Sequence, residues 1–337
     1  MIKHPSTWLA ARPEGLLCIP GGFYIDPVRP VDQAVVTHGH ADHARAGHGA
    51  VIATPETLAI MACRYGENFT LQRKPLAYGE TVEIGEVRVT LHPAGHITGS
   101  AQIAMEYGGA RVVVSGDYKR RFDPTCRPFE PIPCDVFITE ATFALPVFRH
   151  PPIAGEIDKL LQSLALFPER CHVVGVYSLG KCQRLMLALR DRGYDRPIFL
   201  HGALVKLTEL YGALGLDLGP WQPIGHMDKR RLAGEIVLAP PSAIADRWSR
   251  GLPEALACAA SGWMQIRARA KQARVELPLV ISDHCDWGEL LQSIVDTGAA
   301  ELWVTHGRDE ALVHQARLMG LKAQALSLVG YEDDIGD

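Results

Sequence analysis

The sequence lacks several features that mark common classes of protein. Its 337 residues contain no run of eighteen apolar residues, no internal repeat and no low-complexity stretch, and its eight cysteines form no CxxC pair. The N-terminal residues do not show the charged and then apolar layout of a secretory signal. We therefore expect reduced thiols in a cytoplasmic protein that has neither a membrane span nor a membrane partner.

The sequence also has no general excess of basic residues. Its formal net charge is −4, and such an average argues weakly against a nucleic-acid partner. The charge is unevenly distributed, however, because residues 150–275 hold 17 basic and 11 acidic residues, a net charge of +6, while the remainder carries −10. This asymmetry fits either chance or a basic segment that contacts phosphates beside an acidic, metal-binding core.

The pattern of apolar residues divides the chain into two kinds of segment. In the first 145 residues, short apolar runs separated by Gly and Pro predict strands, and Thr54-Pro55 predicts the start of a helix. Beyond residue 146 helices alternate with strands, residues 219–262 follow no clear pattern, and the earlier style then resumes. We therefore expect an α/β protein in which residues 150–275 form a domain inserted into one made of residues 1–149 and 276–337. The predicted strands are 31–37, 51–53, 87–91, 111–115, 136–139, 173–177, 198–200, 279–281 and 302–304, and the predicted helices are 157–166 and 180–192.

The densest group of candidate metal ligands follows the first of these strands. His38 and His40 stand at i and i+2 of an extended segment, so they point to the same side and can share one metal ion. Asp42 and His43 follow the next turn and can reach a second ion. Imidazole and carboxylate ligands together suit zinc or manganese. A solvated, histidine-rich loop is the alternative interpretation.

Three more candidate ligands, His96, Asp117 and His306, follow or end predicted strands. Each taken alone is more typical of an ordinary loop residue. A carboxylate at the end of a very apolar strand, as at Asp117, is costly unless it binds cations, and Asp117 could bridge two ions. Together with the first group they predict a two-metal site, which lowers the pKa of a water and stabilises displacement at phosphorus. Such a site needs no serine nucleophile, and the sequence has no G-x-S-x-G motif.

The strings HGHADH, AGH and SGD, in this order and followed by a late histidine, resemble the metallo-β-lactamase superfamily. The inserted segment makes the chain similar to the β-CASP nucleases of that superfamily, which act in mRNA 3′-end processing, as ribonuclease J and as Artemis-like repair enzymes. Three further motifs of that family match Glu140 in TEATF, His284 in SDHCDW and His306 in an HG step. The resemblance covers about Gly21 to Leu326 and implies a four-layer αββα metallo-β-lactamase sandwich with an inserted α/β β-CASP domain.

The resemblance also implies a role for each residue. One metal would be held by His38, His40 and His96, the other by Asp42, His43 and His306, with Asp117 between the two. The catalytic residues would be Asp42, Asp117, Glu140 and His284. In that set His284 would protonate the leaving oxygen, contact the phosphate or take a metal position. Glu140 would orient it, the alternative being an ordinary carboxylate at the end of a strand.

Weaker patterns suggest contacts with phosphates. Ser178, Gly180 and Lys181 lie in YSLGKCQR at an expected helix start, where free N–H groups attract anions, although a plain serine cap is an equal alternative. Arg120, in the basic run after Asp117, is predicted to meet the substrate. The basic run at residues 267–274 is more typical of a solvated face. We interpret His92 and His201 as packing or supporting residues.

The substrate is the least constrained part of the prediction. A histidine at the third β-CASP motif, here His306, is usual among members that act on RNA. The strings VVTHGHADHARAGHG, YSLGKCQR and SDHCDW instead resemble bacterial ligase-associated DNA exonucleases, which are placed with DNA ligase and helicase functions in repair. We therefore predict a DNA exonuclease with two Zn²⁺ or Mn²⁺ ions, with an RNA-processing nuclease as the alternative. The basic insert counts against a small-molecule thioesterase or lactonase, and the complete ligand set counts against a non-catalytic scaffold.

Overall fold

The computed structural model describes residues 2–225, 227–307 and 309–328, and the chain divides into two compact units. Phe148–Asp283 form one of them, the inserted unit. The described residues before and after it form the other, the discontinuous unit. The segment that the sequence suggested as an insert, residues 150–275, falls inside the inserted unit, which extends further at both ends.

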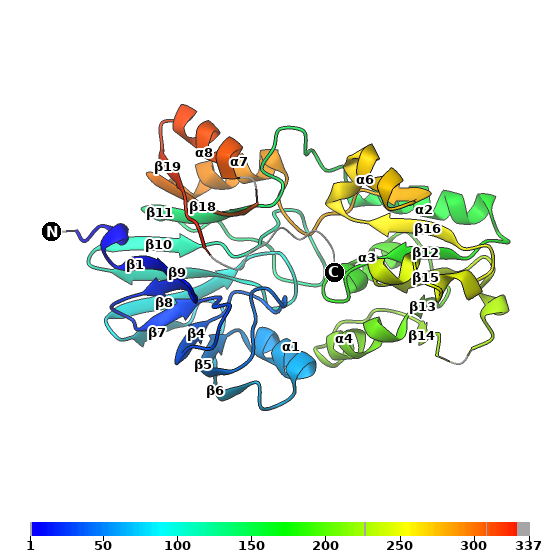
Figure 1. The fold of residues 1–337 in the computed structure, drawn as a ribbon, viewed down its shortest axis with the longest axis horizontal. Helices are drawn as coiled ribbons and strands as arrows, with labels where there is room; N and C mark the ends of the chain where they lie inside the picture. The colour runs from blue at the N-terminus through cyan, green and yellow to red at the C-terminus, as the bar shows by residue number, and fades with distance from the viewer. Residues whose placement is uncertain (1, 226, 308, 329–337) are drawn as a thin grey trace. The chain divides into compact units, whose positions relative to one another are not determined.

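Two sheets pack face to face in the discontinuous unit (Figure 1). The core between them joins Phe23 and Val35 from one sheet to Leu91, Met105 and Ile138 from the other, all buried. The first sheet has the order β1-β2-β3-β4-β5-β6 and consists of β1 (Leu9–Arg12), β2 (Gly15–Cys18), β3 (Phe23–Ile25), β4 (Gln33–Val35), β5 (His48–Ala53) and β6 (Thr70–Pro75). The second has the order β19-β18-β11-β10-β9-β8-β7 and consists of β7 (Thr81–Ile84), β8 (Val87–Pro93), β9 (Ala101–Tyr107), β10 (Ala110–Val114), β11 (Val136–Ala141), β18 (Glu301–Gly307) and β19 (Lys322–Ala325).

Helices cover the outer face of each sheet. Leu58 and Met61 of α1 (Pro55–Tyr65) pack on the first sheet. Leu290 of α7 (Trp287–Thr297) and Leu312 of α8 (Asp309–Leu318) pack on the second (Figure 1). The predicted αββα order of layers is therefore confirmed. The helix start at Thr54-Pro55 is also as predicted, because the Thr54 side chain accepts a hydrogen bond from the Thr57 amide and Pro55 occupies the first turn.

The pairing of three strands brings candidate residues to one edge of the second sheet. β10 is parallel to β11, and β11 is parallel to β18. Asp117 follows β10 and Glu140 lies near the end of β11. Carboxyl ends of parallel neighbours meet at the same sheet edge, so both carboxylates are delivered there. The nearby Gly95 has a φ of 73°, and a Cβ there would stand 2.3 Å from the Lys119 carbonyl oxygen, so only glycine fits.

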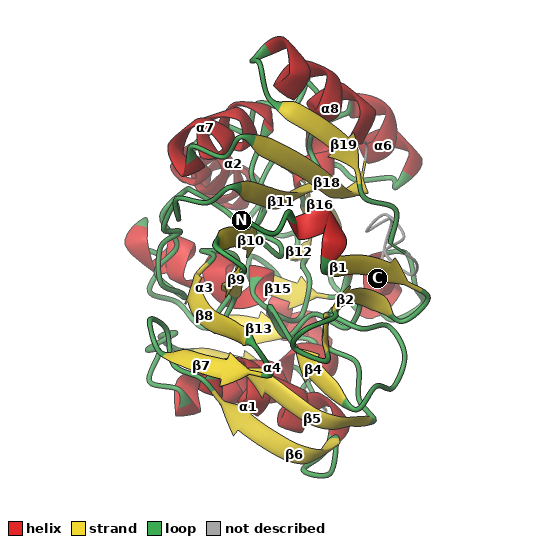
Figure 2. Ribbon diagram, turned by 90° about the vertical axis from the view of Figure 1, so that its left-hand side faces the viewer, coloured by secondary structure: helices red, strands yellow, loops and turns green. Residues whose placement is uncertain are grey.

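The inserted unit is built on a parallel sheet, visible among the arrows of Figure 2. Its order is β14-β13-β15-β12-β16-β17. Residues 219–262 had no readable pattern because strands such as β15 are buried on both faces and do not alternate. The expected strand at 279–281 is found two residues earlier. The elements are α2 (Ile153–Leu166), β12 (His172–Gly175), α3 (Lys181–Asp191), β13 (Ile198–Leu200), α4 (Gly202–Ala213), β14 (Trp221–Pro223), β15 (Ile236–Ala239), α5 (Pro241–Ile244), β16 (Leu256–Ala260), α6 (Arg267–Gln272) and β17 (Leu277–Leu279).

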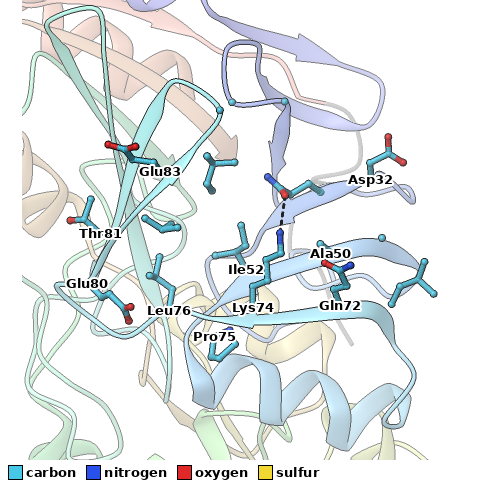
Figure 3. Close-up of a pocket in the computed structure, with 18 residues that line it drawn as sticks. Asp32, Ala50, Ile52, Gln72, Lys74, Pro75, Leu76, Glu80, Thr81 and Glu83 are labelled. Atoms are coloured by element: carbon cyan, nitrogen blue, oxygen red, sulfur yellow. Dashed lines mark hydrogen bonds between the residues drawn. The ribbon is translucent and has the colours of Figure 1, made fainter.

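A hollow of about 780 Å³ lies between β4–β6 and β7 in the discontinuous unit (Figure 3). Its lining combines apolar side chains such as Ile52 and Leu76 with Lys74, whose ammonium donates to the Gln33 side chain. No predicted ligand lines it. The candidate ligands converge elsewhere in the same unit. None of the helices in the described ranges combines the length and apolar character needed to cross a bilayer.

Candidate metal centre

Four predicted ligands converge at the carboxyl end of the second sheet. The ring nitrogens of His38 (Nε2) and His96 (Nε2) lie 3.1 and 3.0 Å from Nδ1 of His40. One ligand atom from each of these histidines and one from Asp117 all lie within 4.8 Å of one another. His38, His96 and Asp117 are buried and His40 is half-buried. This set contains the three residues predicted to hold the first metal.

A second group meets the first at Asp117. Nε2 of His43 lies 3.5 Å from Oδ2 of Asp42 and 3.5 Å from Oδ2 of Asp117. The same Asp117 oxygen stands 3.4 Å from His38 Nε2 and 3.7 Å from His96 Nε2. One carboxylate oxygen is thus shared by both groups, which is the arrangement that a bridging ligand needs. The backbone of His306 ends β18, but its side chain lies outside what the structure describes, so its predicted role stays a prediction.

The protonation of these residues suits divalent cations. Burial, together with the neighbouring rings of His284 and His38, holds the pKa of His96 well below its usual value, so its ring is neutral and can bind metal. Burial opposes ionisation of Asp117, but His43 and His38 keep its pKa well below the usual range. Burial likewise disfavours a charge on His43, yet Asp117, Asp42 and Asp26 raise its pKa well above the usual value, so a metal ion would take the place of the proton that these carboxylates attract. Nitrogen and carboxylate donors surrounding a shared, ionised Asp117 fit divalent metals of the zinc and manganese type.

Asp26 supports this centre and was not predicted from the sequence. It is buried and directly follows β3. Its Oδ1 accepts from the Thr37 amide at 2.7 Å, and its Oδ2 accepts from the Thr37 hydroxyl at 2.6 Å and from Nδ1 of His43 at 2.8 Å. A carboxylate at the end of an apolar strand is the signal that identified Asp117, and it would have identified Asp26 if the three-residue strand Phe23–Ile25 had been recognised.

The hydrogen bonds of Asp26 fix which nitrogen of two histidines carries the proton. Because the Thr37 hydroxyl donates to Asp26, it accepts from Nδ1 of His38, which lies 3.0 Å away. His43 also donates from Nδ1, to Asp26 itself. Both rings therefore keep a proton on Nδ1 and direct Nε2 toward Asp117, so that a metal ion would bind at Nε2 by displacing any proton held there. A carboxylate that orients a metal-binding imidazole in this way also raises its basicity.

Glu140 and His284 form a pair beside the ligands. Nδ1 of His284 lies 3.0 and 2.9 Å from the two Glu140 oxygens. Glu140 is buried and also accepts from the Tyr118 amide and the Thr142 hydroxyl. The His284 ring is 4.7 Å from the His96 ring, centroid to centroid, and ligand atoms of Asp117, Glu140 and His284 lie within 4.8 Å of one another. The orientation of His284 by Glu140 stays a prediction, for which this hydrogen-bonded pair supplies the necessary contact.

The basic residues predicted to meet phosphate near Asp117 are engaged with acidic side chains. Arg120 pairs with Asp296 at 2.6 Å and lies over the Phe129 ring. Arg121 pairs with Asp286 and Glu289, both on α7 or at its cap. The substrate contact predicted for Arg120 stays a prediction, and the ion pair gives this side chain a structural role as well.

The residues of the inserted unit that were predicted to contact phosphate lie at the start of α3. Gly180 has a φ of 85° and its amide donates to the Gln183 side chain, while Ser178 is partly exposed. Lys181 is buried, donates to the Ile281 carbonyl and pairs with Asp283 at 3.0 Å. A phosphate would therefore have to compete with Asp283 for this ammonium, and the predicted role of these residues in binding is not tested by the geometry.

His92 and His201, which we interpreted as packing or supporting residues, each have neighbours in the structure that fit such a role. His201 caps α4 by accepting from the Ala203 amide, and its ring lies against Trp248. His92 lies within β8, where burial lowers its pKa. In α6, Arg269 stacks on Trp263 with its guanidinium carbon 3.9 Å from the ring centroid, which gives one member of the basic run a packing function.

Comparison with known families agrees with this fold. Residues 8–159 match the model of the β-lactamase superfamily domain. The chain therefore carries a domain of this superfamily, and the resemblance drawn from HGHADH, AGH and SGD is confirmed at that level. A solved structure of a protein of unknown function from Enterococcus faecalis V583 superposes with a TM-score of 0.54 at 14% identity, over 81% of this chain and 74% of that one, and this similarity concerns the fold alone.

Among curated proteins, relatives with DNA and RNA names both occur. A probable DNA ligase of Opitutus terrae is 28% identical over 330 residues, covering 95% of this chain and 31% of that protein. Transcription termination factor FttA of Methanosarcina mazei is 28% identical over 55% of this chain and 35% of its own length. Cleavage and polyadenylation specificity factor subunit 3 of Dictyostelium discoideum is 28% identical over 57% of this chain and 30% of its own. The chain thus spans about a third of the length of these relatives.

Proposed function

We propose that this protein is a metal-dependent nuclease that hydrolyses phosphodiester bonds of DNA as an exonuclease in DNA repair. The observation that carries the proposal is the convergence on one Asp117 oxygen of two groups of ligands, with the Glu140–His284 pair beside them. A thioesterase or lactonase would need the ligands but not this second pair. By analogy with the family, His306 completes the second group.

Two divalent cations, Zn²⁺ or Mn²⁺, would supply Lewis-acid charge for a phosphate oxygen and a lowered pKa for the attacking water. The chain's own residues position these reactants. Asp26 and Thr37 keep the proton of His38 and His43 on Nδ1, so that Nε2 is available to bind. Glu140 accepts a hydrogen bond from Nδ1 of His284 and orients the ring, so that Nε2 would face the leaving oxygen and deliver a proton to it.

The choice of DNA rests on how much of the chain each relative covers. The similarity to the probable DNA ligase extends over 95% of this chain, whereas those to proteins with transcription or RNA-processing names extend over about half. We therefore propose that the protein acts together with a DNA ligase, and with a helicase, in repair. An RNA-processing nuclease is the second candidate, because relatives named endoribonuclease match 56% of the chain and because His306 stands at the position typical of RNA-acting members.

The test compares both polymers under the same conditions. Purified protein is incubated with DNA and RNA labelled at one end, single- or double-stranded, with Mn²⁺ or Zn²⁺. The Asp42→Ala variant serves as the inactive control, and Asp32→Ala, at an exposed acidic position of the same unit, as its matched control. We expect stepwise shortening of DNA that Asp42→Ala abolishes and Asp32→Ala retains. Cleavage of RNA alone would replace the DNA assignment by the second candidate, and no cleavage of either polymer would reject the nuclease.

A further inference from the structure

The loop that carries Asp117 also presents an exposed aromatic ring. Phe122 stands five residues after Asp117 in the connection between β10 and β11, and 75% of its surface is exposed. This is the highest exposure of any aromatic side chain in the described ranges. A single exposed apolar side chain is common on a protein surface, so the exposure of Phe122 gains meaning from how its loop is held and from what surrounds the ring.

The loop around Phe122 is firmly anchored. Lys119 and Asp123, on either side of it, have 0% and 3% of their surface exposed, and their side chains form a buried ion pair of 2.5 Å. The Lys119 ammonium also donates to the carbonyl of the candidate ligand His96 at 3.3 Å. Asp123 in turn accepts from the amide and hydroxyl of Thr125 at 2.8 and 2.7 Å. The ring is therefore held outward by a fixed backbone, which is itself tied to the metal centre.

The other exposed aromatic rings are covered by cations, and Phe122 is not. Arg64 lies over Tyr65 and Arg170 lies over Phe167. In the described part of the chain no ring contact or cation–π contact involves Phe122. Its neighbours Arg120 and Arg121 instead turn to acidic residues of α7. An apolar ring face is thus left open on the loop that follows Asp117.

We propose that Phe122 is a stacking platform for one unpaired base of the nucleic-acid substrate, a subsite that holds the strand while its phosphodiester lies at the metal centre. Every base has a flat aromatic face, so such a platform binds without sequence preference and needs a base that is free from its partner strand. The proposal rests on the proposed nuclease function and narrows it to a single-stranded terminus, overhang or gap as the bound form.

The experiment measures cleavage kinetics of single-stranded oligonucleotides with Mn²⁺ for the wild type, Phe122→Ala, Phe122→Leu and Phe122→Trp. Phe167→Ala, at an exposed aromatic residue of the inserted unit, is the matched control. A stacked base contributes about 1–3 kcal/mol by alanine substitution, so we expect KM to rise roughly 5- to 150-fold in Phe122→Ala with kcat much less affected. Phe122→Trp should keep the wild-type KM, Phe122→Leu should restore only part of the binding, and Phe167→Ala should match the wild type.

A substrate series identifies the base. An abasic residue is moved one position at a time along the strand, and at one position it should raise the KM of the wild type as much as Phe122→Ala does. At that position the abasic residue should not raise the KM of Phe122→Ala any further, because this variant already lacks the ring on which the base would stack. Unchanged melting temperatures would show that the variants are folded, as expected for an exposed position.

Three results would overturn the stacking proposal. The first is an unchanged KM in Phe122→Ala while the wild type cleaves, which would leave the nuclease proposal intact. The second is a rise in KM that every abasic substrate shows equally, and the third is a change of oligomeric state in Phe122→Ala, which would mean that the ring docks against a protein. A wild-type protein that cleaves neither DNA nor RNA would remove both this proposal and the proposed function.

Discussion

Replacing Asp26 by Asn should weaken metal binding without disturbing the shape of the site. Asp26 has a φ of 42°, a left-handed conformation that Asn adopts more easily than most residues, so the backbone can stay as it is. The new amide can still accept the Thr37 N–H bond through its oxygen. Its NH₂ group would face the Thr37 hydroxyl and Nδ1 of His43, two groups that now donate to Oδ2.

The substitution should weaken metal binding because it displaces two protons, one on the His43 ring and one on the Thr37 hydroxyl. His43 would have to move its proton to Nε2, the nitrogen that faces Asp42 and Asp117, in order to accept from the new amide. The Thr37 hydroxyl, turned to accept from Asn, would compete with the bond from His38. Hydrogen bonds to charged groups contribute about 1.5–3 kcal/mol each. Loss of a supporting partner of a metal ligand commonly lowers metal affinity or activity by roughly 10–100-fold, or about 1.4–2.7 kcal/mol.

We therefore expect Asp26→Asn to bind Zn²⁺ or Mn²⁺ roughly 10–100-fold more weakly than the wild type, as measured by competition with a chromophoric chelator. Asp32→Asn, at an exposed position in the same unit, is the matched control and should bind like the wild type. Affinity within twofold of the wild type in a folded Asp26→Asn protein would refute the reasoning, because the proton positions of His38 and His43 would then not depend on Asp26.

Three further predictions concern the Glu140–His284 pair, the proposed metal ions and the inserted unit. Glu140→Gln should lower kcat for cleavage by about 10–100-fold while metal content by elemental analysis stays unchanged; a parallel loss of metal would assign Glu140 to the ligands. Removing metal with a chelator should lower the melting temperature, and restoring an ion at 100 times its Kd should return roughly 2.7 kcal/mol, or about 5–10 °C; identical melting curves would contradict a metal centre. Asp283→Asn should lower the free energy of unfolding in urea by about 3–5 kcal/mol, because the buried cations Lys181 and Arg184 lose their carboxylate partner. Asp195→Asn, at an exposed position of the same unit, should leave it unchanged. Equal stability of the two variants would show that the pairing contributes little.

Local patterns in the sequence picked out most of the candidate ligands that converge in the structure. The spacing of His38, His40, Asp42 and His43 could be interpreted because all four lie in one short segment after a strand. Asp26 was missed because its strand is only three residues long and too short for periodicity to reveal. The pairing of Lys119 with Asp123 was missed for another reason, since a lysine beside two arginines suggests a solvated basic surface. Lys119 is instead buried, and its burial depends on how the loop after β10 folds back against the sheet, which the local sequence does not reveal.

The remaining part of the site depends on strand order, which no local pattern contains. β11 pairs with β10, which ends 22 residues before it, and also with β18, which begins 160 residues after it. The β11–β18 pairing joins the two sequence segments of the discontinuous unit, and it sets Ala141 opposite Gly307 at the edge of the sheet where Glu140 and Asp117 lie. Similarly, Glu140 bonds His284 across 144 positions of the sequence. Composition and spacing cannot predict such pairings, because many parallel partners would satisfy the same apolar strands. Only the family resemblance suggested that Glu140 and His284 meet. The physical reason lies in the contacts of the segment before α7: the Cys285 amide donates to the Tyr118 carbonyl, and the Tyr118 amide donates to Glu140.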